Sequence, residues 1–158
     1  MSTVHLPLVA EIERLLHDAK SPPWEPILER LLAHFQCPVG TVHLVDAQGL
    51  LQMQAQKGLP AELLDKVQTI PVGKGMAGIA AERKEPVQIC NLQTDASGVV
   101  RPNAKMTKME GSLAAPMLRD GKVFGVLGVA KPFAYDFTPA ETATLMAVGA
   151  RLAEMTSA

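Results

Sequence analysis

The sequence predicts an α+β fold: a mainly antiparallel sheet of about six strands, with helices from both chain ends packed on one of its faces. Three observations lead to this prediction. Apolar residues recur at helical spacing near both ends of the chain, whereas apolar and polar residues alternate in the middle. Short turns that contain glycine join the alternating stretches in pairs. Strands joined by such turns run antiparallel.

Two amphipathic helices are expected before the first strand. Residues 5–19 carry one apolar stripe with charged residues between its members, and Ile27 to Phe35 repeats the pattern. Ser21-Pro22-Pro23 separates the two stretches, because proline disfavours helical continuation. Cys37-Pro38 ends the second stretch.

The spacing of apolar residues then changes from that of a helix to the alternation of two β-strands, which predicts a hairpin. Residues 39–45 form a strand that is nearly apolar on both faces, and residues 51–55 alternate apolar residues with glutamines. Asp46-Ala47-Gln48-Gly49 joins them with residues typical of a turn. Residues 61–67 then have the length of one or two helical turns, and residues 69–72 form a short β-branched strand.

The C-terminal part repeats this logic. Residues 113–118 and 123–129 flank an Asp120-Gly121 turn and predict a second hairpin. Thr138-Pro139-Ala140-Glu141 has the pattern of a helix start, with threonine as N-cap, proline at the first position and glutamate at the third. The helix is expected to run to about Met155. One of its faces carries Leu145, Val148, Gly149 and Leu152.

The middle of the chain predicts a ligand cavity. A glycine-rich turn precedes a short helix near residues 77–84, and residues 86–89 form a strand. Residues 91–111 have no clear element, and a loop of that length in a compact domain is usually functional. Helix and loop together would cover the second face of the sheet. A cavity is expected between that face and the 91–111 segment.

Length and composition fit one domain over residues 1–158. The scaling of surface with mass predicts that about two thirds of the unfolded chain's surface is buried. Hydrophobic residues make up 47% and charged residues 20%, which excludes a disordered tail. The net charge of −1 offers no basic excess for nucleic acid. No apolar run has the length of a membrane span, and the N-terminus lacks the pattern of a signal peptide.

The cysteines and histidines predict neither a metal site nor thiol catalysis. Cys37 and Cys90 are the two cysteines and form no CxxC motif, so we expect reduced thiols, buried as small hydrophobic residues, in a cytoplasmic protein. The four histidines are far apart in the sequence and form no HxH or HxxxH motif. Gly73-Lys74-Gly75-Met76-Ala77-Gly78 lacks the ending of a phosphate-binding loop, and we interpret its glycines as a tight turn.

Five segments, taken in this order and spacing, resemble the GAF domains of signalling proteins. The resemblance covers about residues 20–157 and leaves helix 5–19 as an additional element. It implies a six-stranded antiparallel sheet in the order 2-1-5-4-3-6 or a close variant, a helical layer behind it and a ligand pocket in front. The segments are Ile70-Pro71-Val72-Gly73-Lys74-Gly75-Met76-Ala77-Gly78, Glu85-Pro86-Val87-Gln88-Ile89, Ala115-Pro116-Met117, Gly125-Val126-Leu127-Gly128-Val129 and Phe137-Thr138-Pro139-Ala140-Glu141.

The resemblance implies several functions, and departures from the family's motifs sort them. GAF domains bind cyclic nucleotides, bilins, haem, 2-oxo acids, nitrate and other small molecules, or serve as dimerisation modules, and one branch reduces free methionine-R-sulfoxide. Asn103-Ala104-Lys105 does not match the cyclic-nucleotide signature. The reductases carry a cysteine in the glycine-rich turn, where this chain has Ala77, and further cysteines in the long segment, where residues 91–111 have none. The sequence shows neither a cysteine placed for bilin attachment nor a haem ligand, and the cofactor is unknown.

The 91–111 segment supplies the expected ligand-binding residues. Arg101, Lys105 and Lys108 share a face if residues 102–110 are helical, and the simpler interpretation is a solvated basic face with two methionines in the core. The functional interpretation is a lid whose polar groups reach a small anionic or zwitterionic ligand. The expected ligand-binding residues are Met76, Asn91, Asp95, Arg101, Asn103, Lys105, Met106 and Met109.

The sequence therefore favours a small-molecule sensor rather than an enzyme, with no catalytic or metal-binding residue. Ligand binding would order the 91–111 segment and bias the terminal helices, which pass the signal to a partner protein or through a homodimer. Two alternatives stay open: an enzyme related to the free methionine-R-sulfoxide reductases, and a dimerisation module without ligand. The apolar seams of the terminal helices would supply the dimer contact. The sequence does not distinguish a full-length protein from a fragment.

Overall fold

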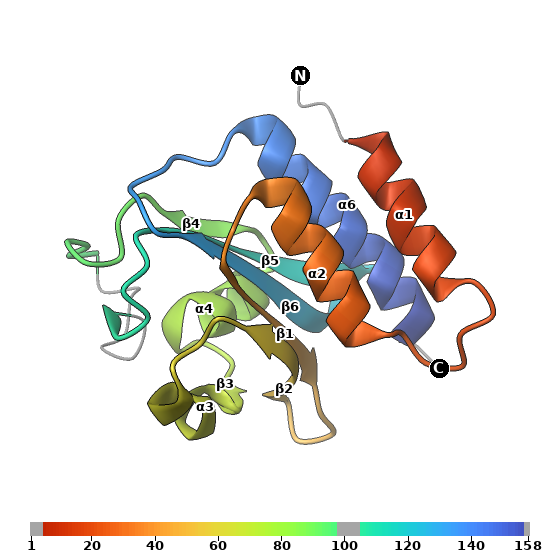
Figure 1. The fold of residues 1–158 in the computed structure, drawn as a ribbon. Coiled ribbons are helices and arrows are strands. Elements are labelled where there is room, and N and C mark those ends of the chain that lie inside the picture. The colour runs from red at the N-terminus through yellow and green to blue at the C-terminus, as the bar shows by residue number, and fades with distance from the viewer. Residues whose placement is uncertain (1–4, 98–104, 157–158) are drawn as a thin grey trace.

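The computed structural model describes residues 5–97 and 105–156 and has the α+β architecture that the sequence predicts (Figure 1). A six-stranded sheet lies between a layer of long helices and a layer of short ones. The helices are α1 (Leu6–Leu16), α2 (Trp24–Phe35), α3 (Ala61–Val67), α4 (Gly75–Arg83) and α6 (Pro139–Thr156). The strands are β1 (Val39–Val45), β2 (Leu50–Lys57), β3 (Thr69–Pro71), β4 (Val87–Ile89), β5 (Gly111–Arg119) and β6 (Lys122–Lys131).

The sheet has the order β3-β2-β1-β6-β5-β4, and every neighbouring pair is antiparallel. If β3 is left out and the other five strands are renumbered along the chain, their order is 2-1-5-4-3, which matches the first five places of the expected order. The sixth strand differs in position. β3 pairs with β2 through Leu50–Gln52, because the short helix α3 returns the chain beside the start of β2. The sheet is therefore a close variant of the expected one, with its extra strand at the β2 edge.

Both predicted hairpins are confirmed, and local chemistry explains their turns. Asp46 Oδ1 accepts hydrogen bonds from the backbone N–H groups of Gln48 and Leu50, each at 2.9 Å, and Gly49 takes a φ of +81°. At the second turn Asp120 and Gly121 both have positive φ, as a type I′ turn requires. The two turns set the register of β1 with β2 and of β5 with β6.

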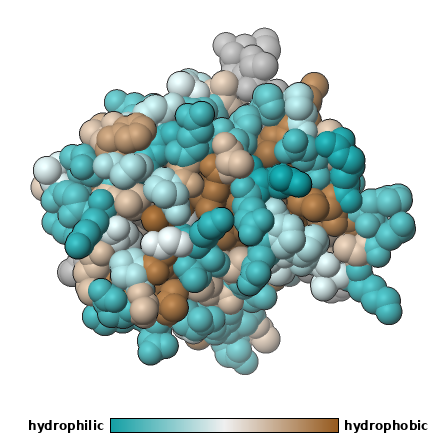
Figure 2. Space-filling view, in the orientation of Figure 1, coloured by the Kyte–Doolittle hydropathy of each residue, from teal (hydrophilic) through white to brown (hydrophobic). Residues whose placement is uncertain are grey.

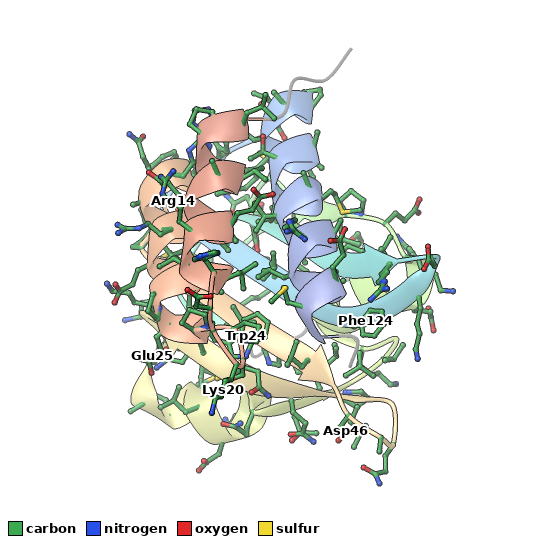
Figure 3. All side chains as sticks on the ribbon, turned by 90° about the vertical axis from the view of Figure 1, so that its right-hand side faces the viewer. Arg14, Lys20, Trp24, Glu25, Asp46 and Phe124 are labelled. Atoms are coloured by element: carbon green, nitrogen blue, oxygen red, sulfur yellow. The ribbon has the colours of Figure 1, made fainter. Side chains whose placement is uncertain are left out.

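α1, α2 and α6 form the layer on one face of the sheet, and Figure 3 looks onto it. α2 and α6 contact the strands, whereas α1 packs on α2 and α6 as an outer element. Leu8, Ile12 and Leu16 of α1 are buried in this way, so Leu8 and Ile12 of the expected N-terminal seam pack within the chain, while Leu15 of that seam is half-buried and Val4 lies outside the described residues. Arg14 points outward from α1, and Asp46 lies at the tip of the first hairpin (Figure 3).

The C-terminal helix begins with the predicted capping box. The Glu141 backbone N–H donates to Thr138 Oγ1 at 3.1 Å, and the Thr138 N–H donates to Glu141 Oε1 at 2.9 Å. One face of α6 packs on β5 and β6. The residues buried on this face include the four that the sequence predicts, Leu145, Val148, Gly149 and Leu152.

One buried lysine links the sheet to the helical layer. Lys131, at the end of β6, is 4% exposed, and its Nζ donates to the Phe35 carbonyl at 2.6 Å. That carbonyl belongs to the last turn of α2, where a cation also interacts favourably with the helix dipole. The rings of Phe133, Tyr135 and Phe137 surround the ammonium, with the Tyr135 centroid closest at 4.5 Å. Among the described residues Lys131 forms no ion pair.

The segment after Lys105 corrects the helical interpretation of residues 102–110. Residues 106–110 form a turn and irregular structure, and Lys108 has a left-handed φ of +62°. Met106 is exposed and Met109 is half-buried, so neither is the core methionine that the simpler interpretation placed there. Residues 101–104 lie outside the described residues.

The face seen in Figure 2 is mostly hydrophilic, with brown areas interrupted by polar side chains. The large apolar side chains that are exposed in the described part of the chain, for example Leu6 and Phe133, lie far apart in the sequence. Within residues 5–97 and 105–156, no helix has both the length and the hydropathy needed to cross a membrane.

Candidate functional site

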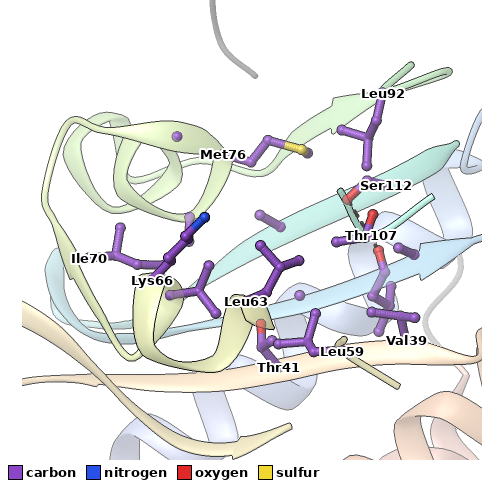
Figure 4. A pocket seen from close by; sticks show the side chains of 18 of the residues that line it. Val39, Thr41, Leu59, Leu63, Lys66, Ile70, Met76, Leu92, Thr107 and Ser112 are labelled. Carbon is purple, nitrogen blue, oxygen red and sulfur yellow. Dashed lines mark hydrogen bonds between the residues drawn. The ribbon is translucent and has the colours of Figure 1, made fainter. Parts of the chain in front are cut away.

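A cavity of about 220 Å³ lies between the sheet and the layer that contains α3 and α4 (Figure 4). It is on the face opposite α2 and α6, as the sequence predicts for the pocket. Its lining comes from four strands, two helices and the loops beside them. The lining residues are Val39, Gly40, Thr41, Leu59, Leu63, Lys66, Val67, Thr69, Ile70, Pro71, Lys74, Gly75, Met76, Ala77, Leu92, Thr107, Ser112, Leu113, Ala114, Gly128, Val129 and Ala130.

The floor of the cavity is built from small side chains at paired positions of three central strands. Thr41 of β1 pairs with Gly128 of β6, and Gly128 pairs with Ala114 of β5. A Cβ atom added at Gly128 would lie 3.0 Å from Thr41 Oγ1, which is a tight contact. Apart from its chain neighbours, no other heavy atom of the described residues lies within 4 Å of that position, so the space above the strand is open except for the hydroxyl. The neighbouring row of the floor consists of Val39, Ala130 and Ser112.

The α3 wall of the cavity is held by a buried histidine. Leu63 of α3 is fully buried against the cavity. His43 Nε2–H donates to the Val67 carbonyl at 2.8 Å, which fixes the end of α3 to β1. The other ring nitrogen, Nδ1, is buried without a hydrogen-bond partner among the described residues. Burial lowers the pKa of His43, and the imidazole stays neutral with its proton on Nε2.

The α4 wall begins at the glycine-rich turn. Gly73 and Gly75 have φ values of +92° and +69°, and a Cβ at Gly78 would lie 2.4 Å from the Pro71 carbonyl oxygen. These positions need glycine for backbone reasons, which supports the interpretation of the motif as a tight turn. Lys74, the N-cap residue, makes no side-chain cap hydrogen bond. The first turn of α4 borders the cavity.

The polar side-chain groups of the lining are hydroxyls and ammonium groups. Thr41, Thr69, Thr107 and Ser112 carry hydroxyls, of which that of Thr69 donates to Gln52 Oε1 at 2.7 Å. Lys66 and Lys74 are exposed lysines that border the cavity. In Figure 4 Lys66 lies at the end of the cavity near Ile70 and Met76, whereas Thr107 and Ser112 lie at the other end. No aspartate or glutamate is among the described residues that line the cavity. The site therefore has an apolar middle, Lys66 at one end and the hydroxyls of Thr107 and Ser112 at the other.

Of the eight residues that the sequence proposes for the ligand, Met76 lines this cavity. Asn91 instead makes local contacts: its Nδ2 donates to Glu110 Oε1 at 3.1 Å, and its Oδ1 accepts from the Gln93 backbone. Asp95 accepts hydrogen bonds from the Ser97 backbone and hydroxyl.

The remaining proposed residues lie in the second half of the same segment. The carbonyls of Lys105 and Met109 both accept hydrogen bonds from Gln93 Nε2, at 3.1 and 2.8 Å, which ties the segment to itself. Met106 is exposed and outside the lining. Arg101 and Asn103 lie outside the described residues. A ligand contact by these residues stays a prediction.

Sequence reasoning missed the sheet floor and the α3 wall. A signal for the floor was present, because Ser112 with Ala114 and Gly128 with Ala130 place small residues two apart on adjacent strands. Such alternation leaves room above one face of a sheet. The α3 wall had no such signal, because its contact with the cavity depends on how the chain folds back between β2 and β3.

Neither cysteine has the properties of a reactive thiol. Cys37 is buried, and burial raises its pKa to about 11. Cys90 is exposed, contrary to the expectation that it is a buried hydrophobic residue. Desolvation and then the charge of Asp136 raise the pKa of its thiol as well. Both thiols are therefore protonated at neutral pH, and neither lines the cavity. Within the described ranges no cluster of three or more His, Cys, Asp or Glu side chains is placed to hold a metal ion.

Comparison with known proteins identifies the family. The model of the GAF domain family matches residues 25–155 of this chain. No curated protein sequence matches this chain.

Solved structures show the same fold at low sequence identity. The GAF domain of the Acinetobacter phosphoenolpyruvate-protein phosphotransferase has a TM-score of 0.80 and 21% identity, covering 99% of this chain and 95% of its own. The corresponding GAF domain from Coxiella burnetii has a TM-score of 0.78 and 22% identity, covering 96% and 92%. The free methionine-R-sulfoxide reductase from Neisseria meningitidis, solved with its substrate, has a TM-score of 0.78 and 19% identity, covering 99% and 96%.

Proposed function

Because this chain belongs to the GAF domain family, we propose that it is a regulatory module that senses a small molecule in the cavity above the sheet. GAF domains are commonly sensory or regulatory, and the neighbours include the GAF domain of a phosphotransferase and a domain of a two-component sensor histidine kinase protein. The observation that carries the proposal is the cavity itself, with a floor kept open at Gly128 and walls from α3 and α4. A module that only dimerises would have no need of this space.

The size of the cavity limits the ligand. A cavity of about 150 Å³ in another protein holds benzene, so by proportion 220 Å³ accommodates about nine non-hydrogen atoms. Haem, bilins and cyclic nucleotides are much larger than this. They would fit only if α3 or α4 moved away from the sheet. We therefore propose a ligand of the size of a small metabolite.

The output of the sensor is proposed to act through the helical layer. Ala130 lines the cavity, and the next residue, Lys131, holds the end of α2 through the Phe35 carbonyl. A ligand that moves β6 at Ala130 would therefore act on α2 directly. The receiving element would be a partner protein or a second copy of this chain in the cytoplasm. We propose that the sensing unit spans about residues 20–157, with α1 as an added outer element.

Native mass spectrometry of the protein purified from cells tests the proposal. The wild-type protein is expected to retain a small mass, and a Gly128→Val variant should lose it, because the added side chain occupies the floor of the cavity. Gly128→Ala is the intermediate variant, since its single methyl group displaces only the Thr41 hydroxyl. Circular dichroism checks that all three proteins keep the fold. An identical retained mass in wild type and Gly128→Val would place the ligand elsewhere.

The similarity to free methionine-R-sulfoxide reductases makes an enzyme the second candidate. Only the fold supports it at 19% identity. A reductase needs a thiolate at the substrate, whereas Cys37 and Cys90 both have raised pKa values and lie outside the cavity lining. An assay with free methionine-R-sulfoxide and a thiol reductant decides between the two. Turnover that is lost in a Cys90→Ser variant would establish the enzyme.

A dimerisation module is the third candidate, and the same experiment addresses it. If the protein is a dimer in native mass spectra but carries no small mass, a thermal-shift screen of metabolites follows. A screen without any stabilising compound, in wild type and in Gly128→Val alike, would favour the module over the sensor. A stabilising compound whose effect is lost in Gly128→Val would favour the sensor.

A further inference from the structure

We propose that the cavity selects a small monocarboxylate with an apolar body and rejects zwitterionic amino acids of the same shape. This inference rests on the proposed function, because it names the ligand class of the same cavity. Its basis is the distribution of charge and polarity around the lining.

The described lining of the cavity contains two lysines and no anionic group. Lys66 near the end of α3 and Lys74 just before α4 both belong to the cavity lining. Neither lysine forms an ion pair with a described residue. Figure 4 shows the Lys66 ammonium directed toward α4 and Met76 rather than away from the cavity. A carboxylate in the cavity therefore has two lysines in the lining that form no ion pair with a described residue.

The rest of the lining favours a ligand with an apolar carbon skeleton. Leu63 is fully buried, and Leu59, Ile70, Met76 and Leu92 complete the walls above a floor of small side chains. A branched aliphatic chain that leaves water for this space gains the free energy of apolar burial. About nine non-hydrogen atoms, including the carboxylate, fill the volume of 220 Å³.

The same lining disfavours an ammonium group on the ligand. An α-ammonium beside the carboxylate would lie close to Lys66 and Lys74, and like charges repel. No carboxylate in the described lining offers it an ion pair, so its desolvation would be only partly compensated by hydroxyls and backbone carbonyls. Removing the ammonium while keeping the carbon skeleton should therefore strengthen binding.

A second carboxylate is disfavoured for a related reason. It would reach the far end of the cavity, where Thr107 and Ser112 supply hydroxyls and the described lining has no cation. Ser112 Oγ lies 3.5 Å from the Val129 carbonyl, and Thr107 Oγ1 accepts from the Met109 backbone N–H. These hydroxyls suit a neutral polar atom better than a charge.

Isothermal titration calorimetry with three matched probes tests the inference. The probes are 4-methylpentanoate, 4-methylpentanamide and leucine, which share one branched skeleton and carry an anionic, a neutral and a zwitterionic head. We expect 4-methylpentanoate to bind at least tenfold more tightly than the amide, and leucine to bind more weakly than either.

Paired lysine variants test whether Lys66 and Lys74 cause the preference for the carboxylate over the amide. The double variant Lys66→Gln with Lys74→Gln should weaken 4-methylpentanoate about tenfold and leave the amide unchanged. The control Lys20→Gln with Lys84→Gln removes the same total charge from exposed lysines outside the lining, and it should change neither affinity. Added salt should weaken the carboxylate alone.

The outcomes separate this inference from the proposed function. Equal affinity for the amide and the carboxylate would overturn the charge argument while leaving a small-molecule cavity in place. Tighter binding of leucine would overturn the rejection of zwitterions. If none of the three probes binds while Gly128→Val still removes a retained mass, the ligand class is wrong and the cavity is still the binding site. If no mass is retained either, the proposed function fails as well.

Discussion

The hydroxyl of Tyr135 donates to Glu141 Oε1 at 2.7 Å, and this contact predicts a strongly shifted tyrosine. The hydrogen bond to the carboxylate, followed by burial and the negative charge, raises the pKa of Tyr135 to about 12. Deprotonation would remove the donor and place a second negative charge beside Glu141. Because Tyr135 is the single tyrosine of the chain, its titration can be read without overlap.

The change to make is Glu141→Gln, which keeps an acceptor oxygen and removes the charge. The pKa of Tyr135 should then fall from about 12 toward the ordinary tyrosine value of about 10. Raising the pKa in the folded state means that the contact stabilises the fold at all pH values below about 10, and that the gain is lost as pH rises through about 12. A Tyr135→Phe variant therefore loses this stabilisation at neutral pH.

The loss of stability expected for Tyr135→Phe depends on the charge of Glu141 and on the exposure of the two side chains. A hydrogen bond to a charged partner contributes about 1.5–3 kcal/mol when it is well buried. The tyrosine and glutamate are only partly buried, so solvent screening reduces the expected loss in Tyr135→Phe to about 1 kcal/mol. The aromatic ring that lies over Lys131 is retained in this variant, so the loss reports the hydroxyl alone.

Ultraviolet absorbance of the tyrosinate, followed during an alkaline titration, measures the pKa, and urea unfolding measures the stability. A wild-type tyrosine that titrates near its ordinary value would refute the reasoning, as would a Glu141→Gln variant that titrates like the wild type. Circular dichroism over the same pH range must show that the fold persists through the titration.

Three further predictions concern the fold and its titrating groups. Thr138→Ala removes the N-cap acceptor of α6 and should cost about 1 kcal/mol in urea unfolding, whereas Thr138→Ser should cost much less. Burial lowers the pKa of the His43 imidazole in the folded protein, so the unfolded state binds the proton more readily. The free energy of unfolding should therefore fall as pH drops below about 6.5. A His43→Gln variant should show a shallower pH dependence in unfolding experiments between about pH 7.5 and about pH 5.5. Alkylation of the native protein should modify Cys90, slowly because its pKa is raised, and leave the buried Cys37 untouched until denaturant is added; mass spectrometry of the intact protein would reveal a second adduct if Cys37 were accessible.

Most of the fold could be predicted because its signals are local. The Asp120-Gly121 turn, the alternation on its flanking strands and the Thr138 capping box each depend on residues a few positions apart. The edge position of β3 could not be read in the same way. It depends on how α3 returns the chain to β2, which is a tertiary arrangement of a three-residue strand.

The face of the sheet that bears the candidate site was predicted, but its cover was predicted only in part, because α3 and α4 form the walls and the 91–111 loop contributes Leu92 and Thr107. The expected cavity on the second face is present, and Met76 lines it. The long 91–111 segment attracted the other choices because it combines polar residues without a regular period. Asn91 and Asp95 instead use their side chains for turns within that segment. The lysines that border the cavity, Lys66 and Lys74, come from helix ends, and only the folded chain reveals that both belong to its lining.

Because Lys131 is enclosed, the rate at which its amine reacts can report how often the structure opens locally. An amine that is 4% exposed and surrounded by aromatic rings can react with an acylating reagent only when α2 and β6 separate. The exposed lysines, such as Lys20, react from the closed state and supply the intrinsic rate. The ratio of the two labelling rates therefore measures how often the helical layer lifts from the sheet. Recorded with and without a bound small molecule, that ratio would show whether occupancy of the cavity is felt on the far side of the sheet.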